Sequence, residues 1–426
     1  MPSNYSFNIY ERLKSRRTTL AVIGIGYVGR PVLESFAKHF NTIGYDIDSK
    51  LIDSLRGSIG KNAKLSASEE SLDDASFFIV TVATPIDSRK LPDLTQLVEA
   101  SRTVGRHLKR GDYVVFESTV YPGCTDTVCI PILEKTSGMI AGKDFKVGYS
   151  PERISPGDPS HTFANTEKIV SATDNEALDE IKKVYSSAIS ADIHSASSIK
   201  VAEASKIVEN VQRAVNIALM NELHQLFCSI DIDLTEVLEM ASTKWNFAKY
   251  RPGLVGGHCI PVDPYYLLSE ASRLGIDIPV TQSGCAVNDN MVRYIAESIC
   301  NGLSAQCGVS RTTKALIMGI TYKADTDDIR NSQTAELFRI LVNNSIETHV
   351  VDPYADSAKV FDFYGIKLNP EPEPPYDIII STVGHKPYAS LDDRYFRSIA
   401  FGPESILVDI GCTHKDKITS IRYWGI

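Results

Sequence analysis

Several signatures of specialised protein classes are missing from the sequence. Its 426 residues include eight cysteines but no C-x-x-C pair, so neither a disulfide framework nor a zinc site is indicated. No apolar run approaches the roughly 18 residues that a membrane-spanning helix needs. Positive charge is scarce, because 44 Lys and Arg face 53 Asp and Glu and give a net charge of −9. We therefore expect a cytoplasmic protein with reduced thiols that binds no metal, no nucleic acid and no membrane.

The remaining composition is that of a globular protein. The chain is 43% hydrophobic and 23% charged, which is close to the average of folded domains. At roughly 150 residues per domain, its length indicates two or three domains. The acidic balance leaves open where the positive charge for an anionic ligand would come from.

The first informative motif is a glycine-rich turn near the N-terminus. A short apolar run, Leu20 to Ile25, leads into a G-x-G-x-x-G match from Gly24 to Gly29. Apolar residues at every fourth position then predict a helix, and a second strand over 42–47 contains Asp46, 20 residues after Gly26. This order of strand, turn, helix, strand and acid is typical of a dinucleotide-binding domain.

Residues of this turn have distinct physical roles in the expected site. Gly24 allows the tight turn, Gly26 lets the backbone approach the pyrophosphate, and Gly29 lets helix and strand pack closely. The helix N-terminus attracts the phosphate charge. Asp46 would accept hydrogen bonds from ribose hydroxyls and repel a 2′-phosphate, which favours NAD over NADP. The cofactor residues predicted here are Gly24, Gly26, Tyr27, Val28, Gly29 and Asp46.

Polar residues follow three further predicted strands. Thr84 follows the apolar run 77–83, Thr119 follows the strand that starts at 113, and Glu152 follows the strand over 146–149. Ligands of open parallel sheets bind at the carboxyl ends of the strands. The two threonines are therefore candidates for cofactor contact, and Glu152 is a candidate general base. Alternatively, the hydroxyls only cap the following helices and the carboxylate is a solvated loop group.

A helical pattern extends over about 30 residues from Ser197 to Phe227. A helix of that length usually joins domains or forms a dimer face. Lys206 and Asn210 are four residues apart on it, so their side chains lie on one face. Two interpretations stay open for this pair, a functional site and a solvated polar stripe.

The segment from Tyr250 to Asp263 is the most unusual in the chain. Glycines and prolines surround Cys259, so the backbone is specialised to present this thiol. A thiol after Gly256-Gly257 suits close approach to a substrate carbon, whereas a small buried thiol is the structural alternative. His258 is its neighbour, but adjacent side chains point apart, so a Cys-His dyad is not expected.

The C-terminal part repeats the pattern of the N-terminal part. Its turn keeps only Gly319 of the glycines and carries Lys323 and Arg330 instead. Such a turn cannot hold a dinucleotide in the same way, but its charges suit another phosphate ligand. Asp352 takes the place of Asp46. Strands are expected over 314–320, 348–352, 377–383 and 406–410, with a helix over 332–343.

Together these patterns predict an α/β protein. We expect two doubly wound, Rossmann-like domains joined by a long central helix and a small all-helical region. The expected domains are residues 1–198, which bind NAD, residues 199–306, which carry the cysteine loop and dimerise, and residues 307–426, which bind a second ligand. The chain is expected to cross into the last domain over 306–313.

This arrangement resembles the UDP-glucose/GDP-mannose dehydrogenase family over nearly the whole chain. The resemblance implies an NAD-dependent enzyme that oxidises the C6 alcohol of a nucleotide sugar to the carboxylate with two NAD, while the C-terminal domain binds the UDP-sugar. The motifs that carry it are the turn from Gly24, Ser118-Thr119-Val120, Ser150-Pro151-Glu152, Glu203-Ala204 with Lys206 and Asn210, Gly256-Gly257-His258-Cys259 with Asp263, and Lys323 to Arg330.

The resemblance also implies roles for individual residues. Cys259 would capture the C6 aldehyde as a thiohemiacetal, which is oxidised to a thioester and then hydrolysed. Glu152 would be the base for hydrolysis, with Thr119 beside it. Lys206 and Asn210 would stabilise the oxyanion.

Further roles follow from the same resemblance. Asp263 would order a water or help to remove the alcohol proton, and Arg330 would reach toward the cofactor, which Thr84 and Thr119 also contact. Arg251 would serve the substrate, from the same or a partner subunit. The implied substrate residues are Glu152, Arg153, Lys206, Asn210, Tyr250, Arg251, Gly257, Tyr322 and Lys323.

The finer pattern is similar to that of bacterial UDP-N-acetylhexosamine 6-dehydrogenases. UDP-glucose members read Pro-Glu-Phe-Leu where this chain begins the stretch Pro151 to Asp158, and they carry Lys where it has Val262. We expect UDP-GlcNAc or UDP-GalNAc as substrate, O-antigen or capsule precursors as product, and a homodimer or larger homo-oligomer. The sugar configuration at C4 and the role of Arg30 stay open.

The alternatives are few. UDP-glucose or UDP-ManNAc would fit the same fold, as would a two-electron oxidation of a simple hydroxy acid. A nucleotide-binding protein without activity is the third alternative, and it conflicts with the intact set of Cys259, Lys206, Asn210 and Asp263.

Overall fold

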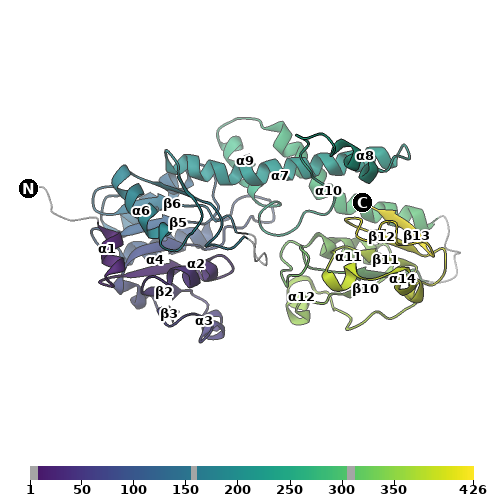
Figure 1. The fold of residues 1–426 in the computed structure, drawn as a ribbon, viewed down its shortest axis with the longest axis horizontal. Coiled ribbons are helices and arrows are strands. Elements are labelled where there is room, and N and C mark those ends of the chain that lie inside the picture. The colour runs from purple at the N-terminus through teal and green to yellow at the C-terminus, as the bar shows by residue number, and fades with distance from the viewer. Residues whose placement is uncertain (1–7, 155–160, 305–311) are drawn as a thin grey trace, which may run out of the picture. The chain divides into compact units, whose positions relative to one another are not determined.

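The structure is a computed structural model that describes residues 8–154, 161–304 and 312–426 (Figure 1). Two compact units are formed, residues 1–209 with 265–276 and residues 210–264 with 277–426. The crossing expected over 306–313 lies largely outside the described residues, as does the end of the stretch 151–158. The domain boundaries at 198/199 and 306/307 stay predictions.

The first unit contains one eight-stranded sheet with strand order β3-β2-β1-β4-β5-β6-β7-β8. Neighbours from β3 to β6 are parallel, β7 is antiparallel to β6, and β8 is parallel to β7. The order of β1 to β6 is that of a dinucleotide-binding sheet, so the predicted first Rossmann-like domain is confirmed. The strands are β1 (Thr19–Ile23), β2 (Thr42–Tyr45), β3 (Ala63–Ser66), β4 (Ala75–Val80), β5 (Tyr113–Phe116), β6 (Lys146–Tyr149), β7 (Lys168–Ala172) and β8 (Ile193–Ser195).

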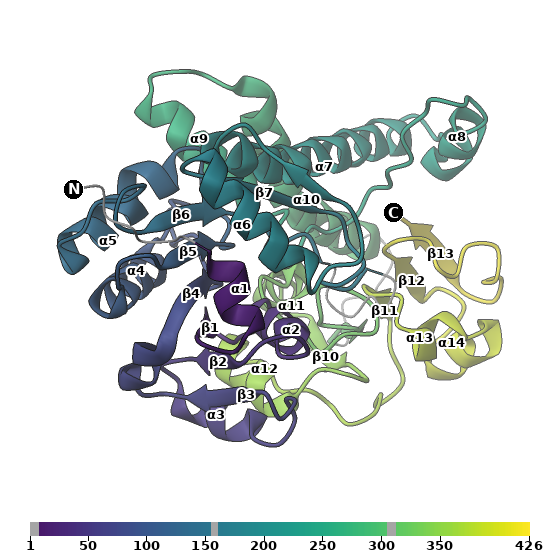
Figure 2. The ribbon, with the colours of Figure 1, turned by 60° about the vertical axis from the view of Figure 1, so that its left-hand side comes forward.

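Helices cover both faces of this sheet. Strand β1 shows why, since Leu20 and Val22 pack into one hydrophobic core and Ala21 and Ile23 into the other. Figure 2 shows α1, α2 and α6 on the same face. The elements on that face are α1 (Ile9–Lys14), α2 (Gly29–Phe36), α3 (Ser49–Leu55) and α6 (Asn175–Ser186), and those on the other are η1 (Glu69–Asp74), α4 (Thr95–His107), η2 (Thr125–Cys129) and α5 (Ile130–Ser137).

The predicted long helix is confirmed as α7 (Ile199–Cys228), which has 30 residues. Its residues beyond Glu209 belong to the second unit. The other helices of the middle region are α8 (Leu234–Ala241), α9 (Asp263–Arg273), whose residues from Tyr265 belong to the first unit, and α10 (Pro279–Ser304).

The second unit contains a parallel five-stranded sheet with order β10-β9-β11-β12-β13. This is the other common doubly wound order, so the second Rossmann-like domain is confirmed. Helices α10 and α11 pack on one face and α14 on the other. The elements are β9 (Lys314–Met318), α11 (Gln333–Asn343), β10 (Glu347–Val351), α12 (Ser357–Tyr364), β11 (Ile378–Ser381), α13 (Lys386–Ala389), α14 (Asp393–Ile399), β12 (Ile406–Asp409) and β13 (Arg422–Gly425).

The sequence pattern does not predict β3, β7, β8 or β13. Strands β3, β8 and β13 lie at sheet edges or ends and are incompletely buried, so they lack a continuous apolar run. Among the helices of the described residues, none combines the length and apolar character needed to cross a bilayer.

Candidate active site

The glycine-rich turn after β1 has the geometry of a dinucleotide site. The turn closes where the Gly24 N–H donates to Tyr45 O at 2.8 Å, and Gly24 has a φ of +85°, which favours glycine. A Cβ on Gly29 would lie 2.0 Å from Gly24 O, so only glycine allows this packing. A Cβ on Gly26 would meet nothing within 4 Å, which leaves open space beside the backbone.

The start of α2 is available to an anion. Its N-cap residue, Val28, makes no side-chain capping hydrogen bond, so the first-turn amides are not occupied by a cap. Tyr27 and Val28 are half-buried. Arg30, whose role the sequence leaves open, is exposed and donates to Glu34 Oε1 at 2.8 Å, one helical turn further on. Arg30 is thus accounted for by a surface ion pair of α2.

Asp46 lies beside this turn. Its two carboxylate oxygens accept from the N–H of Ile25 and of Asp48, each at 3.0 Å, and the residue is half-exposed. A carboxylate has about four acceptor positions, so hydrogen bonds to a ribose remain possible. Turn, helix terminus and acid together fit a dinucleotide.

Thr84 and Thr119, which follow β4 and β5, differ in their contacts. The Thr84 hydroxyl donates to Thr119 O at 2.7 Å, so it joins two strand ends and does not cap a helix. Thr119 itself is half-buried. Tyr266 of α9 donates to Thr84 O at 2.9 Å and adds a third element to this edge of the sheet.

Glu152 is not the solvated group of the alternative interpretation, because only 8% of it is exposed. Its carboxylate accepts from Lys168 Nζ at 2.9 Å, and Lys168 also donates to Glu117 at 2.8 Å. Arg153, next in the chain, pairs with Glu209 of α7 at 2.8 Å. Sequence reasoning did not find Glu117, Lys168 or Glu209. For Glu117 and Lys168, the available signal was a charged residue at one end of an apolar strand.

The part of α7 that belongs to the first unit carries a buried lysine side chain. Lys206 is 9% exposed, and within the described part of that unit it forms no hydrogen bond or ion pair. One turn earlier, the buried Glu203 accepts from the N–H groups of Gly123 and Thr125 and so anchors α7 to the loop after β5. Burial raises the pKa of Glu203 to about 7. A solvated polar stripe is excluded for Lys206.

In the second unit, Asn210 and Asp263 come together as predicted for one site. Both are buried, and the Asn210 side-chain amide donates to the Asp263 carboxylate. The Asp263 N–H donates to Cys259 O at 2.8 Å, so the acid is tied to the cysteine loop. Cys259 is exposed, which rules out the small buried thiol.

The cysteine loop is seated on the turn after β9. A Cβ on Gly256 or Gly257 would lie 2.8 Å from Tyr322, and Gly257 has a φ of +83°. Asn331 donates to Gly257 O at 2.9 Å, and His258 lies 3.8 Å from Asp328. His258 thus lies beside Asp328.

Two predicted substrate residues, Tyr250 and Arg251, and the predicted cofactor residue Arg330 flank this loop. Tyr250 donates to Gln212 of α7 at 2.9 Å. Arg251 is exposed and lines a pocket of about 200 Å³ together with residues of α8 and Lys415. Arg330 donates to Asp328 at 2.9 and 2.7 Å.

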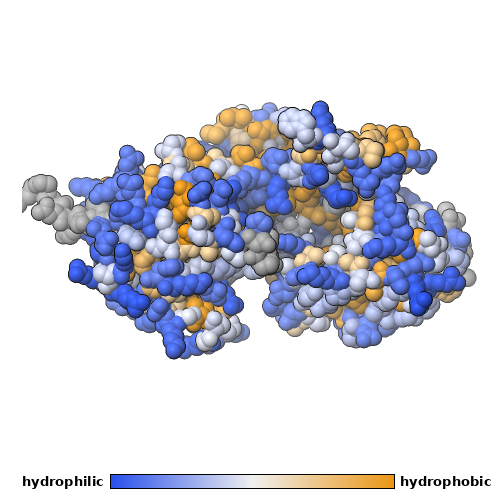
Figure 3. Space-filling view, in the orientation of Figure 1, coloured by the Kyte–Doolittle hydropathy of each residue, from blue (hydrophilic) through white to orange (hydrophobic). Residues whose placement is uncertain are grey.

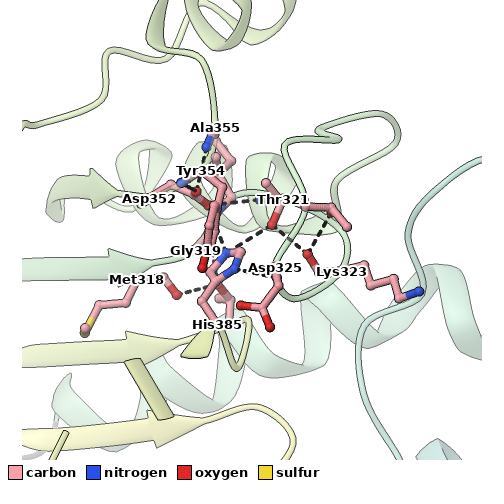
Figure 4. A network of polar contacts seen from close by, with 12 residues as sticks. Met318, Gly319, Thr321, Lys323, Asp325, Asp352, Tyr354, Ala355 and His385 are labelled. Atoms are coloured by element: carbon pink, nitrogen blue, oxygen red, sulfur yellow. Dashed lines mark hydrogen bonds and ion pairs between the residues drawn. The ribbon is translucent and has the colours of Figure 1, made fainter. Parts of the chain in front are cut away.

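The turn that carries Lys323 is held by a buried histidine. His385 accepts from the Asp325 N–H at 3.0 Å through Nδ1, so Nε2 is the nitrogen that carries a hydrogen toward Thr321 and Asp352. Figure 4 shows His385 within this network and the Lys323 ammonium directed away from it. The network therefore shapes the turn through its backbone, including Lys323 O, while the lysine side chain points away from it.

The predicted residues are divided between the two units. Within one unit, the structure brings together Asn210 with Asp263, and Gly257 with Tyr322. Among the described residues, no group of His, Cys, Asp and Glu has an arrangement that could hold a metal ion. The first unit holds Gly24, Asp46, Thr84, Thr119, Glu152, Arg153 and Lys206, and the second holds Asn210, Tyr250, Arg251, Cys259, Asp263, Tyr322, Lys323 and Arg330.

Comparison with protein families identifies three consecutive matches. The models of the UDP-glucose/GDP-mannose dehydrogenase family match over residues 18–189 for the NAD binding domain, 200–290 for the central domain and 316–415 for the UDP binding domain.

Individual proteins are similar over nearly the full length. Protein CapL of Staphylococcus aureus is 41% identical and covers 96% of this chain and 99% of its own. A UDP-N-acetyl-D-glucosamine 6-dehydrogenase of Salmonella typhi is also 41% identical, over 92% of this chain and 95% of its own. The solved structure of a UDP-D-ManNAc dehydrogenase from Pyrococcus horikoshii has a TM-score of 0.86 at 29% identity, covering 96% and 99%.

Proposed function

The chain belongs to the UDP-glucose/GDP-mannose dehydrogenase family, and we propose that it oxidises the C6 hydroxyl of a UDP-N-acetylhexosamine to the carboxylate. As a member of that family it is an NAD-dependent UDP-sugar dehydrogenase. The proposed product is a uronic acid that serves as precursor of a surface polysaccharide. Cys259 is the residue proposed to bind C6 of the sugar covalently during the reaction.

The NAD binding domain spans residues 18–189, and within it the turn after β1 is the proposed cofactor site. Gly26 leaves space for the pyrophosphate, the start of α2 faces its charge, and Asp46 accepts from the ribose. Bound NAD supplies the hydride acceptor for both oxidations. The protein's part is to bind it and to keep the reacting carbon of the sugar in place.

Cys259 supports a four-electron reaction for a chemical reason. After the first oxidation, the C6 aldehyde has no carbinol hydrogen to give as hydride in a second step. Addition of the thiol to the aldehyde forms a thiohemiacetal, which again carries such a hydrogen. Its oxidation gives a thioester, and water then releases the carboxylate and the thiol. Glu152, beside Thr119, is the proposed base for that hydrolysis.

The polar residues on α7 suit the charge that develops on C6 oxygen. Lys206 is a buried cation, and Asn210 is fixed by its hydrogen bond to Asp263. Donors placed in this way contribute roughly 3–4 kcal/mol each to barrier reduction in enzymes with oxyanion sites. Asp263 is proposed to order a water or to help remove the alcohol proton.

The second unit is proposed to bind the UDP-sugar. Lys323 and Tyr322 on the turn after β9, Gly257, Tyr250 and Arg251 offer cations and a backbone loop to a diphosphate and sugar. Arg153 and Glu152 would complete the sugar contacts.

Among UDP-sugars, UDP-GlcNAc or its C4 epimer UDP-GalNAc is the first candidate, because relatives at 41% and 40% identity are named UDP-N-acetyl-D-glucosamine 6-dehydrogenases. UDP-ManNAc is the second candidate, because a relative named UDP-N-acetyl-D-mannosamine dehydrogenase is 32% identical over 79% of the chain.

The main support for the proposed mechanism is the position of Cys259. This residue is exposed on a loop that neighbouring residues hold from two sides. Asp263 ties its carbonyl to α9, and Tyr322 supports the glycines before it. Such support fixes where the thiol stands, which a reaction with a bound aldehyde requires.

The test is a UDP-sugar panel with NADH counted by absorbance. We expect two NADH per molecule of UDP-GlcNAc or UDP-GalNAc, and lower kcat/KM with UDP-ManNAc and UDP-glucose. Cys259→Ala should lose turnover by at least about 1,000-fold, whereas Cys228→Ala, at another exposed cysteine, serves as the matched control. One NADH per sugar, or full turnover of Cys259→Ala, would contradict the proposal.

A further inference from the structure

A buried charged cluster joins three strands of the first sheet. The Lys168 ammonium, at the start of β7, lies 2.8 Å from Glu117 Oε2 and 2.9 Å from Glu152 Oε2. The side chains of Lys168, Glu117 and Glu152 are 3%, 0% and 9% exposed. Tyr185 of α6 donates to the other oxygen of Glu117, and Lys168 lies 5.0 Å from the ring centre of Phe163. Buried ion pairs are often no more stabilising than apolar packing, so stability alone does not account for this cluster.

Glu152 has one acceptor position left. Its Oε1 accepts from the N–H groups of Arg153 and Ile154, both at 2.7 Å, and its Oε2 accepts from Lys168. A carboxylate offers about four lone-pair positions. Within the described part of the first unit these three donors are its partners, so one position on Oε2 is left for a single water.

The cluster distributes its charge unevenly. Burial raises the pKa of Glu117 to about 7, and Lys168 offsets this only in part. Burial acts on Glu152 as well, but the Lys168 ammonium and the two backbone amides outweigh it and lower the pKa of Glu152. Arg153, the other nearby cation, is paired with Glu209. Near neutral pH, Glu117 is therefore partly protonated and Glu152 stays ionised.

We propose that Lys168 and Glu117 are positioning residues for Glu152, in which Lys168 orients the Glu152 carboxylate toward one water and Glu117 competes for the same ammonium. The inference rests on the proposed function of Glu152 in thioester hydrolysis. In that step the water oxygen bonds to the thioester carbon and one water proton passes to Glu152. The carbon–sulfur bond then breaks and leaves the Cys259 thiolate.

Two substitutions test this because they change the field at Glu152 in opposite directions. Lys168→Met removes the cation, so the acid limb of the kcat pH profile should move up by about one unit or more and kcat should fall at least tenfold. Glu117→Leu removes the competing acceptor and leaves Lys168 to Glu152 alone, so the limb should move down. Glu117→Gln is its matched control, because a glutamine still accepts from Lys168 and can bond to Tyr185, so the limb should stay in place.

Three further variants make the result specific. Glu152→Gln should abolish the acid limb and identifies the group that titrates. Lys168→Arg should keep the limb near its wild-type position. Lys146→Met is the matched control, because Lys146 is a buried lysine at the start of β6 whose ammonium pairs with Asp174 at 2.8 Å and with Glu176 at 3.3 Å. It should lower the melting temperature without moving the limb.

The outcomes separate the two proposals. If wild type makes two NADH per sugar but the limb stays fixed in both Lys168→Met and Glu117→Leu, or moves in the same direction, the positioning role is wrong while the proposed function stands. If Lys168→Met does not fold, Glu117→Leu and Lys168→Arg still decide the question. If wild type makes one NADH or none, the proposed function itself fails.

Discussion

Two aspartates at equivalent positions show how one residue can give the two Rossmann-like units different capacities to bind a ligand. Asp46 and Asp352 each follow the second strand of their sheet and accept amides of the first turn. Asp46 accepts one amide on each oxygen and is half-exposed. The Asp352 side chain is fully buried, and besides Ile320 it accepts from the amides of Tyr354 and Ala355 and lies 3.3 Å from His385. Only Asp46 therefore has acceptor capacity left for a ribose.

Burial and partners also set the charge of Asp352. Burial alone would raise its pKa, but His385 and the backbone amides outweigh it and lower the pKa. Its carboxylate is thus a fixed structural anion. The position that we propose for cofactor binding in one unit shapes the Lys323 turn in the other.

We expect Asp46→Ser to weaken the preference for NAD over NADP. The substitution removes charged hydrogen bonds worth about 1.5–3 kcal/mol each and removes repulsion of a 2′-phosphate. The ratio of kcat/KM values for NAD and NADP should fall at least about tenfold, while the KM for the UDP-sugar changes little. Asp48→Ser, at the exposed neighbouring acid that caps α3, is the control. An unchanged ratio in Asp46→Ser would contradict the assignment of Asp46.

Among the elements, helix α7 carries an exposed apolar stripe. Val201, Val208, Leu219 and Leu226 are 47–58% exposed. Their spacings of seven, eleven and seven residues keep them within about 20° of one helical face. Figure 3 also shows hydrophobic surface gathered over α8. Exposed apolar surface arranged in this way marks interaction sites, and the homodimer remains our prediction for what covers the stripe.

The prediction for this element concerns oligomeric state. Val208→Asp with Leu219→Asp puts two charges into the stripe. We therefore expect the dissociation constant of the dimer, measured by sedimentation velocity, to rise at least about 100-fold. Phe361→Asp, at an equally exposed apolar residue of α12, should leave the sedimentation coefficient unchanged. If the double variant sediments like wild type, α7 does not form the dimer face.

For the protein as a whole, the features that could be predicted from the sequence are those that a local pattern of residues encodes. Apolar runs with fixed spacing revealed β1, α7 and the repeat in the second unit, because such runs reflect burial on known faces. The pairing of Lys168 with Glu117 is different, since 51 residues separate them and only the sheet order makes them neighbours. The same applies to His385, which binds a turn residue 60 positions away in the sequence. Spacing along the chain carries no signal for such contacts.

The protein's stability should depend on pH through buried carboxyl groups. Burial raises the pKa of Asp112 to about 6, and that of Glu117 and Glu203 to about 7. A carboxyl with a raised pKa holds its proton in the folded state while the unfolded chain has released it. These three groups therefore bind more protons in the folded state between about pH 4 and 7, and their contribution to stability falls as pH rises through that range.

Asp112 offers the clearest test of this dependence. It is fully buried, its Oδ2 accepts from the Lys109 N–H at 2.8 Å, and Oδ1 has no hydrogen-bond partner among the described residues. Asp112→Asn keeps one acceptor and cannot ionise. From pH 4 to pH 8, we expect the variant to gain up to about 3 kcal/mol in unfolding free energy relative to wild type, at roughly 1.4 kcal/mol per pKa unit. Urea unfolding followed by fluorescence at both pH values measures the gain. Asp356→Asn, at an exposed N-cap whose pKa is lowered, should show no such gain above pH 5. A variant-to-wild-type difference that is constant with pH would mean that Asp112 is not the titrating group.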